Sequence, residues 1–277
     1  MLADRIFLYW PVWLIGLATL VLLLGMMVLG AAARRRRDRR AEEGEEARTH
    51  EGYIVSGALG LLALLLGFTF ALAVDRFDAR RGLVLEEANA IGTTYLRAQL
   101  LDEPHRSRLS RLLAGYAQNR LDLANASDYQ RRAALMAQTN EYQTRLWAET
   151  VAAIRPIRGQ VIAGTFVETM NATIDAGAAR VAARRAHVPS RVLVALLIYM
   201  AVAAFLFGFA MPPKRRPTTT AVLLTLLTLA YGLILDIDRP TSGSIREPQA
   251  AMEDLVEFIR TSPPAAFGTE VAAPTPP

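Results

Sequence analysis

The sequence predicts an all-α, polytopic membrane protein with four transmembrane helices and a helical bundle inserted between the second and third. Two observations predict this class. First, four long runs contain no charged residue, and they cover residues 6–33, 52–74, 192–213 and 217–235. A bilayer core of about 30 Å needs about 20 apolar helical residues, so each run can cross it. Second, residues 75–191 show helical apolar spacing without strand-like alternation. The pattern excludes a soluble globular protein and a single-span anchor.

The order of these runs divides the chain into four parts. We expect a first transmembrane hairpin with a basic cytoplasmic loop over 1–74, and a helical domain over 75–191. A second transmembrane hairpin with an Asp-Arg-Pro boundary motif follows over 192–247, and a short amphipathic helix with a disordered Pro-rich tail over 248–277. The first run is expected to remain as a span, because its basic residues follow it rather than precede it.

Basic residues predict the orientation of the spans. The two short connections on one side, residues 34–52 and 212–216, hold ten arginines and lysines, whereas the short segments on the other side hold four. Short connections rich in Lys and Arg stay in the cytoplasm. We therefore expect an inner-membrane protein whose termini and middle domain are extracytoplasmic. A bacterial source is inferred from composition, because the chain has 30 arginines and one lysine.

The middle domain is expected to consist of helices alone. No proline interrupts residues 53–101, so the second span is expected to continue as one long helix. Asp102 is expected to cap the next helix, which has Pro104 in its first turn. Two more helices are expected over about 128–155 and 158–185. The helix after Asp102 has one apolar face, which holds Leu109, Leu112, Leu113 and Tyr116.

Motifs for enzyme chemistry are missing from the sequence. It has no Gly-rich phosphate loop, no nucleophile elbow and no paired-histidine zinc helix. Cysteine is absent, and His50, His105 and His187 are scattered. Glu86 and Glu87 are adjacent on a helix and cannot face each other, so we interpret them as a solvated face. We expect no enzyme, no cofactor and no metal site.

Two spans carry stripes of small or hydroxylated residues at helical spacing. The second span has Ser56, Gly60, Ala63, Gly67 and Ala71, and the fourth has Thr218, Thr225, Thr228 and Gly232. Such stripes let membrane helices approach closely, so helix–helix packing is the first interpretation. The alternative is the wall of a pore or cavity.

The same two spans end in similar charged sequences. The second closes with Asp75 and Arg76, and the fourth closes with Asp236, Asp238 and Arg239. Ionisable residues at a membrane boundary are expensive unless they are paired or face water. We expect charge pairs that join the helix ends, and an ion vestibule is the alternative.

These residues also carry a resemblance to a known family. The segments Leu66-Gly67-Phe68-Thr69-Phe70, Val74-Asp75-Arg76-Phe77, Glu86-Glu87-Ala88-Asn89-Ala90-Ile91-Gly92-Thr93 and Tyr95-Leu96-Arg97-Ala98 resemble a bacterial membrane family of unknown function called bestrophin-like. The segment 235–243 is similar to that family's ending after the last span. The resemblance covers most of residues 50–250.

Bestrophins are pentameric anion channels with four spans, and the resemblance implies a comparable role. Their pore-neck positions would fall on Gly60, Leu64 and Phe68, with Gly67 beside Phe68. Gly60 departs from the bulky residue expected in a neck, and the acidic calcium clasp of bestrophins has no clear counterpart. Bestrophins hold their large domain in the cytoplasm, which is the opposite of the orientation that the charge count predicts.

We therefore expect a non-enzymatic integral membrane protein that forms an oligomeric ion channel, with anions as the permeant ions. The alternative is a membrane-anchored helical sensor or scaffold whose middle domain binds a partner. The expected partners are the lipid bilayer, further copies of the chain and anions, and no nucleic acid is expected. The channel interpretation is an analogy from the family, because fold alone does not determine activity.

Overall fold

The computed structural model describes residue 7 and residues 10–38, 45–210, 217–239 and 243–268. The chain divides into two compact units. The span unit comprises residues 1–77 and 186–246, and the bundle unit comprises residues 78–185 and 247–277. Every regular element among the described residues is a helix. This confirms the predicted all-α class.

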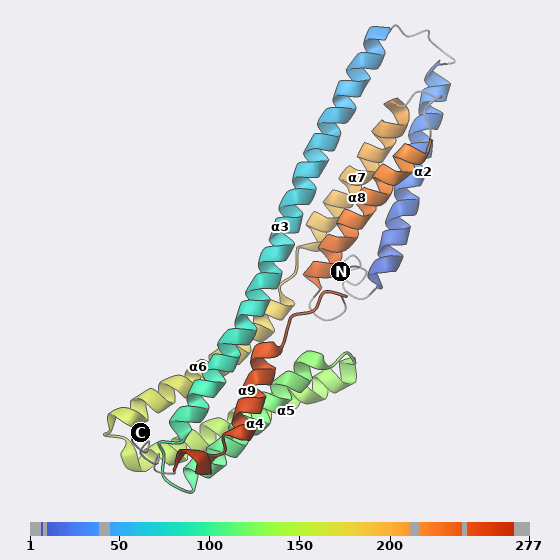
Figure 1. The fold of residues 1–277 in the computed structure, drawn as a ribbon. Helices are drawn as coiled ribbons and strands as arrows, with labels where there is room; N and C mark the ends of the chain where they lie inside the picture. The colour runs from blue at the N-terminus through green and yellow to red at the C-terminus, as the bar shows by residue number, and fades with distance from the viewer. Residues whose placement is uncertain (1–6, 8–9, 39–44, 211–216, 240–242, 269–277) are drawn as a thin grey trace, which may run out of the picture. The chain divides into compact units, whose positions relative to one another are not determined.

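The span unit holds the four long apolar helices. They are α2 (Val12–Asp38), the first part of α3 (Glu45–Ala98), α7 (Ser190–Ala210) and α8 (Pro217–Asp238), and α2 packs against both α7 and α8 (Figure 1). Among the described residues, four segments are long and apolar enough to cross a bilayer, namely Val12–Arg37, Glu51–Ala98, Val161–Ala210 and Thr220–Asp238. The predicted membrane-spanning architecture is therefore confirmed.

The interior of the span unit is apolar, and so is much of its exterior. Its core includes Leu23, Leu62 and Met200, and the buried Tyr231 hydroxyl donates a hydrogen bond to the carbonyl of Leu193 at 3.1 Å. Large apolar side chains also cover the outer surface, among them Trp13, Leu17, Val21, Ile198, Leu226 and Leu229. An apolar exterior of this extent matches hydrocarbon rather than water.

The tightest crossing in the span unit joins α2 to α7 through two glycines. A Cβ atom on Gly30 would overlap the backbone of Phe205, and one on Gly208 would overlap the backbone of Met27. The two helices therefore meet backbone to backbone, which only residues without a side chain permit. The close approach occurs on the first and third spans. It does not involve the predicted stripe of the second span.

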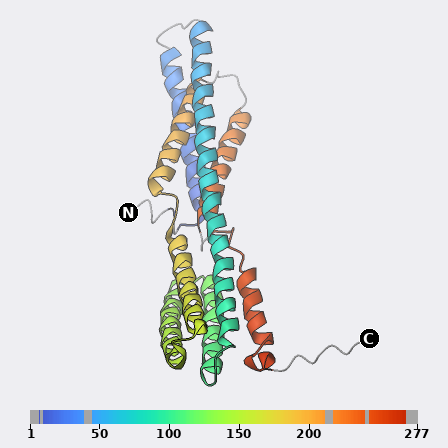
Figure 2. The ribbon, with the colours of Figure 1, turned by 90° about the vertical axis from the view of Figure 1, so that its left-hand side faces the viewer.

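The bundle unit contains the rest of the described helices. They are the last part of α3, α4 (His105–Asn125), α5 (Tyr129–Ile154), the 3-10 helix η1 (Arg155–Ile157), α6 (Val161–Arg185), α9 (Ala250–Thr261) and the 3-10 helix η2 (Pro264–Phe267). Helices α4, α5, α6 and the end of α3 run alongside one another (Figure 2). The expected apolar face of α4 is turned inward, with Leu109, Leu113 and Tyr116 fully buried.

The helix starts follow capping rules, with one correction. Asp128 caps α5, because its carboxylate accepts the backbone N–H of Arg131 at 2.8 Å. The expected capping role of Asp102 in α4 is wrong. Glu103 takes that place, since its carboxylate accepts the Ser107 hydroxyl at 2.8 Å and the Ser107 backbone N–H at 3.3 Å. Glu103 precedes the N-cap residue Pro104, and its side chain reaches forward to the first turn.

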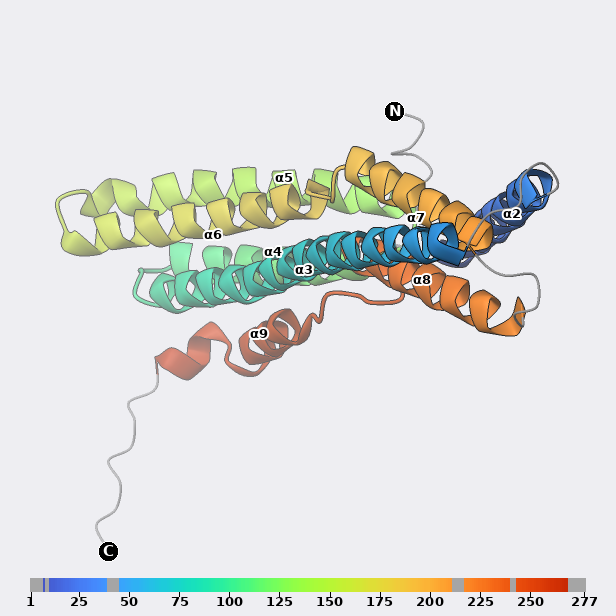
Figure 3. The ribbon, with the colours of Figure 1, turned by 90° about the horizontal axis from the view of Figure 1, so that it is seen from above.

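The C-terminal helix α9 belongs to the bundle unit and lies on the side of α3 and α4 away from α5 and α6 (Figure 3). Its apolar face is buried, and Leu255 approaches Gly92 closely. The segment that follows was expected to be disordered. Its first part instead forms η2, because the Phe267 ring packs edge-on against Tyr95 and the Tyr95 hydroxyl donates to the Ser262 carbonyl at 2.7 Å. Residues 269–277 lie outside the described residues.

Candidate functional site

One face of α3 in the span unit is turned away from the protomer core. Gly60, Leu64, Gly67 and Phe68 lie on this face, which we call the outer α3 face. Phe68 is 66% exposed and Leu64 is 52% exposed, and a Cβ on either glycine would meet nothing within 4 Å. The opposite face carries the packing inside the protomer, through Leu62, Leu66, Thr69 and Ala73. Packing within one protomer therefore leaves the outer α3 face unoccupied.

The stripe on the fourth span borders an apolar groove between α2 and α8. The groove has a volume of about 850 Å³, and its lining includes Thr225, Thr228 and Gly232 of the stripe. The hydroxyl of Thr228 donates to its own helix, to the Leu224 carbonyl at 2.8 Å. Asp236 and Ser244 also line this groove. The side chain of Thr218 is exposed.

Asp236 holds the chain segment that follows α8. Its carboxylate accepts the backbone N–H of Ser244 at 2.8 Å, and it also accepts the Ser244 hydroxyl. Gly243 passes so close that a Cβ there would lie 2.5 Å from the Asp236 carbonyl oxygen. Asp236 thus holds the backbone at Ser244 in place. This arrangement requires glycine at position 243.

Asp238 and Arg239 also bind backbone groups. The Asp238 carboxylate accepts the Val188 backbone N–H at 2.9 and 3.1 Å, just before α7 begins. Nη1 of Arg239 donates to the Trp10 carbonyl at 2.5 Å, just before α2 begins. Asp75 is exposed. Asp238 also lies 3.8 Å from Nδ1 of His187. Pairing between the charges that end the second and fourth spans stays a prediction.

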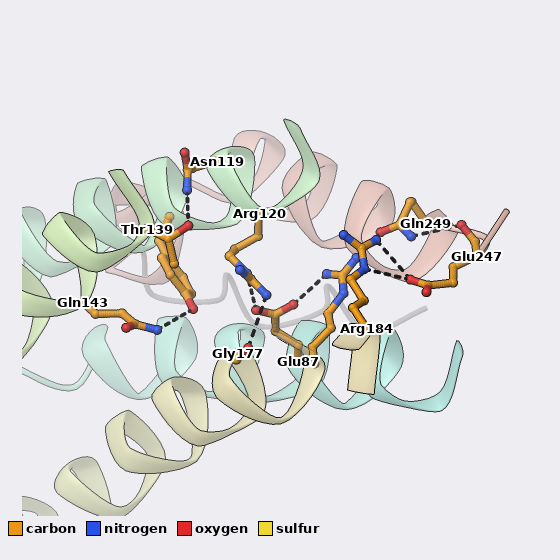
Figure 4. A network of polar contacts seen from close by, with 11 residues as sticks. Glu87, Asn119, Arg120, Thr139, Gln143, Gly177, Arg184, Glu247 and Gln249 are labelled. Carbon is orange, nitrogen blue, oxygen red and sulfur yellow. Dashed lines mark hydrogen bonds and ion pairs between the residues drawn. The ribbon is translucent and has the colours of Figure 1, made fainter. Parts of the chain in front are cut away.

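The bundle unit contains a charged cluster that the sequence analysis missed. Glu87 is fully buried at 0% exposure, which corrects its interpretation as part of a solvated face. Its two carboxylate oxygens accept hydrogen bonds from Nε of Arg120 at 2.5 Å and from Nη1 of Arg180 at 2.6 Å (Figure 4). Three helices, α3, α4 and α6, therefore meet at one carboxylate.

A second carboxylate extends this cluster toward the C-terminal segment. Glu247 accepts hydrogen bonds from Nε and Nη2 of Arg184 at 3.2 and 3.0 Å, and it lies 3.1 Å from Nε of Arg80. Gln249 connects the two halves, because its Oε1 accepts from Nη2 of Arg180 and its Nε2 donates to the Glu247 carbonyl (Figure 4). The residues before α9 are thereby joined to α3 and α6.

Tyr116 and Gly177 close the cluster on another side. A Cβ on Gly177 would lie 2.6 Å from the Tyr116 hydroxyl and 3.3 Å from Oε1 of Glu87, so the glycine leaves room for both groups. The Tyr116 hydroxyl accepts a hydrogen bond from Gln143 at 3.3 Å. Burial raises the pKa of the Tyr116 phenol, so the phenol stays neutral and keeps its proton.

A separate groove lies between α4 and α5. Its volume is about 540 Å³, and its lining combines arginines with a few apolar side chains: Arg108, Arg111, Leu112, Tyr142, Arg145, Ala148 and Glu149. Nδ1 of His105 lies 2.6 Å from Glu149. His105 is therefore paired, not isolated as its sequence context indicated. No group of three or more His, Asp or Glu side chains that could hold a metal ion occurs in the described part of the chain.

Comparison with known families decides the classification. A family model of the bestrophin-like domain matches residues 17–251. The chain belongs to the bestrophin-like family. The match includes α2 from residue 17 onward, the other three apolar helices and most of the bundle unit, so the resemblance inferred from the short segments is confirmed. Among curated proteins no match is found.

Solved structures show the bestrophin-like fold at low sequence identity. A membrane protein variant aligns with a TM-score of 0.66 at 14% identity, over 88% of this chain and 97% of its own. Two variants of a bacterial bestrophin homologue from Klebsiella pneumoniae align with TM-scores of 0.65 and 0.64, at 14% and 16% identity. They cover 90% and 88% of this chain, and each covers 97% of its own. The likeness shows that the fold is shared.

Proposed function

We propose that this bestrophin-like protein is a non-enzymatic, oligomeric ion channel whose pathway is lined by the outer α3 face. The observation that carries the proposal is the exposure of Phe68 and Leu64 on the side of α3 opposite the protomer core. Several copies arranged in a ring could turn these faces toward a common axis. The choice of anions as permeant ions comes from the resemblance to bestrophins.

The position of Phe68 makes it the expected constriction of such a pathway. It is the largest side chain on the outer α3 face, and the two glycines beside it add no bulk. A ring of phenylalanines closes a narrow pore by excluding water. Asp75 lies on the same side of α3, about two turns later, and it is exposed. A ring of copies would therefore also carry carboxylates along the pathway, and carboxylate rings favour cations.

We expect Phe68→Ala to raise chloride flux several-fold in liposomes that contain the purified protein, because the smaller side chain lets water and ions pass. Sodium flux is measured in the same vesicles. The matched control is Phe70→Ala, which removes an exposed ring at the same depth but about 160° around the helix. The proposal is supported if the wild type and Phe68→Ala both carry chloride flux above that of empty liposomes. Phe68→Ala should exceed the wild type in this flux, and Phe70→Ala should not.

Two results of that assay contradict parts of the proposal. If assembled wild type and Phe68→Ala both carry no flux above empty liposomes, the channel proposal is wrong. If only sodium flux appears, the pore is retained and the assignment of anions is wrong, as the Asp75 carboxylates would explain.

The orientation proposed here follows from charge alone. The ten basic residues in the two short connections place those connections in the cytoplasm, so both termini and the bundle unit are extracytoplasmic. We expect a reporter that is active only in the periplasm to be active when it is fused after Pro277. The same reporter inserted at Gly44 is the matched control and should be silent. The reverse pattern would establish the orientation that the bestrophin resemblance implies.

A scaffold that binds a partner through the bundle unit is the second candidate. The observation that favours it is the groove between α4 and α5, whose lining has three arginines, one glutamate and a few apolar side chains and suits an acidic, partly apolar segment. Ion flux by the purified protein alone separates the two candidates, because a scaffold without a pore carries none.

A further inference from the structure

The groove between α2 and α8 lies at membrane depth. Both of its walls belong to segments that are long and apolar enough to cross a bilayer, Val12–Arg37 and Thr220–Asp238. The groove opens outward, because Leu17 on one wall and Leu229 on the other are exposed. The bilayer core holds no water, so a space on this surface is filled by hydrocarbon or by another protein.

The length of the groove matches one leaflet of the bilayer. Its lining runs from Pro11 to Leu20 on α2 and from Thr225 to Asp236 on α8. These stretches are about 14 and 17 Å long at the helical rise of about 1.5 Å per residue. Half of a bilayer core of about 30 Å is about 15 Å. The groove therefore extends from the membrane boundary, where α2 begins and α8 ends, to the region of the midplane.

The polar side chains that line the groove are already bonded within the protein. The hydroxyls of Thr225 and Thr228 each donate to a carbonyl one turn earlier in their own helix, at 2.8 Å. At the boundary end, Asp236 and Ser244 are bonded to each other. What the groove offers to an occupant is therefore apolar contact, which suits hydrocarbon and gives a polar partner nothing to bind.

Two glycines give the groove its depth. A Cβ atom on Gly16 would approach only the Thr228 methyl group, at 4.0 Å, and a Cβ atom on Gly232 would meet nothing within 4 Å. The crossing of α2 and α7 is different, because Gly30 and Gly208 there bring two backbones into contact. Between α2 and α8 the small residues leave space instead of closing it.

We propose that this groove binds an acyl chain of a membrane phospholipid, whose headgroup lies at the boundary beside the exposed Trp13. Tryptophan is typical of the level of lipid headgroups. The length of the groove favours a lipid over a second copy of the chain. A helix that crosses the membrane would need a matching surface beyond Leu20 and Thr225, whereas an acyl chain ends at the midplane. The site is independent of the outer α3 face and of ion conduction.

The test measures the phospholipid that stays with the purified full-length protein after extended washing in detergent, by mass spectrometry of the intact protein. We expect the wild type to retain phospholipid. Its melting temperature after complete delipidation should rise when phospholipid is returned, because a ligand that binds only the folded state stabilises it. Phosphatidylglycerol and phosphatidylethanolamine with the same acyl chains should give equal rises, since the groove binds the chain and not the headgroup.

Variants that fill the groove assign the lipid to this site. Gly232→Leu places a side chain in the open space of the groove, so it should lower the retained phospholipid several-fold and remove the rise in melting temperature. Thr225→Phe fills the groove from its other end and should act in the same direction. The matched control is Gly25→Leu, because Gly25 is an equally open glycine on α2 outside the groove. It should retain phospholipid as the wild type does.

Four outcomes overturn the proposal. Wild type that retains no phospholipid has no such site, and equal loss in Gly25→Leu means that the lipid belongs to the general shell around the spans. A rise with only one of the two phospholipids means that a headgroup is recognised. Retained lipid together with a smaller oligomer in Gly232→Leu means that a second copy occupies the groove. If Gly232→Leu does not fold, Thr225→Phe decides. None of these results depends on whether the protein conducts ions.

Discussion

Glu87→Ala is expected to lower the free energy of unfolding by about 3–5 kcal/mol, which is the range for removing one partner of a buried ion pair. The substitution leaves Arg120 and Arg180 buried without a common acceptor, and it removes the charged links from α3 to α4 and α6. Thermal and denaturant unfolding of the purified protein would measure the loss.

The adjacent residue provides the matched control. Glu86→Ala removes the same carboxylate from the same helix, but Glu86 is exposed and should change the free energy of unfolding by no more than about 0.5 kcal/mol. Replacing Glu87 by Leu and Arg120 by Met together should cost less than the sum of the single changes, because the two residues interact directly. Equal effects of Glu86→Ala and Glu87→Ala would show that the cluster does not stabilise the fold.

Gly208→Ala is expected to destabilise the span unit although it adds only one methyl group. The new Cβ would overlap the backbone of Met27, so α2 and α7 must separate. Overpacking of this kind costs about 1–3 kcal/mol, and more where backbone must move. Thermal unfolding in detergent, monitored by loss of the folded monodisperse fraction, would show the effect. Gly30→Ala should act in the same direction from the other helix.

Replacing a glycine that faces open space by alanine is expected to stabilise the protein instead. Gly25 lies on α2 with nothing within 4 Å of a Cβ, so Gly25→Ala should stabilise by up to about 1 kcal/mol through helix propensity. Gly60 and Gly67 on the outer α3 face are just as open within one protomer. Equal destabilisation by Gly25→Ala and Gly208→Ala would contradict the interpretation that position 208 needs glycine because α2 and α7 cross closely there.

The helices and spans could be predicted because their signals are local. A run of about 20 uncharged residues indicates a span wherever it occurs, and the absence of proline indicates that a helix continues. The long helix expected over 53–101 is observed as α3 (Glu45–Ala98) for this reason. The one capping error concerned Asp102, because the carboxylate that accepts the Ser107 groups in the first turn is that of Glu103.

The sequence contains patterns that indicate both the close crossing of α2 and α7 and the buried charged cluster around Glu87. Ala204 and Gly208 are two small residues four apart on the third span, which is the spacing of a close helix crossing. Glu87 shares its helix face with Val84, Ala88, Ile91 and Tyr95, all buried. A carboxylate on such a face must find partners inside the fold. Adjacency to Glu86 gave the wrong interpretation, because neighbours on a helix point in different directions.

By itself, the sequence determined that the chain is helical, that it crosses a membrane and how its segments follow one another. Only the tertiary structure decided which side of each helix is occupied. The outer α3 face is free because Leu62, Leu66 and Thr69 on the opposite side already fill the protomer core. Arg120 and Arg180 reach Glu87 from 33 and 93 residues away. Local spacing fixes the direction of a side chain on its own helix, but its partner depends on how distant helices pack, which spacing does not encode.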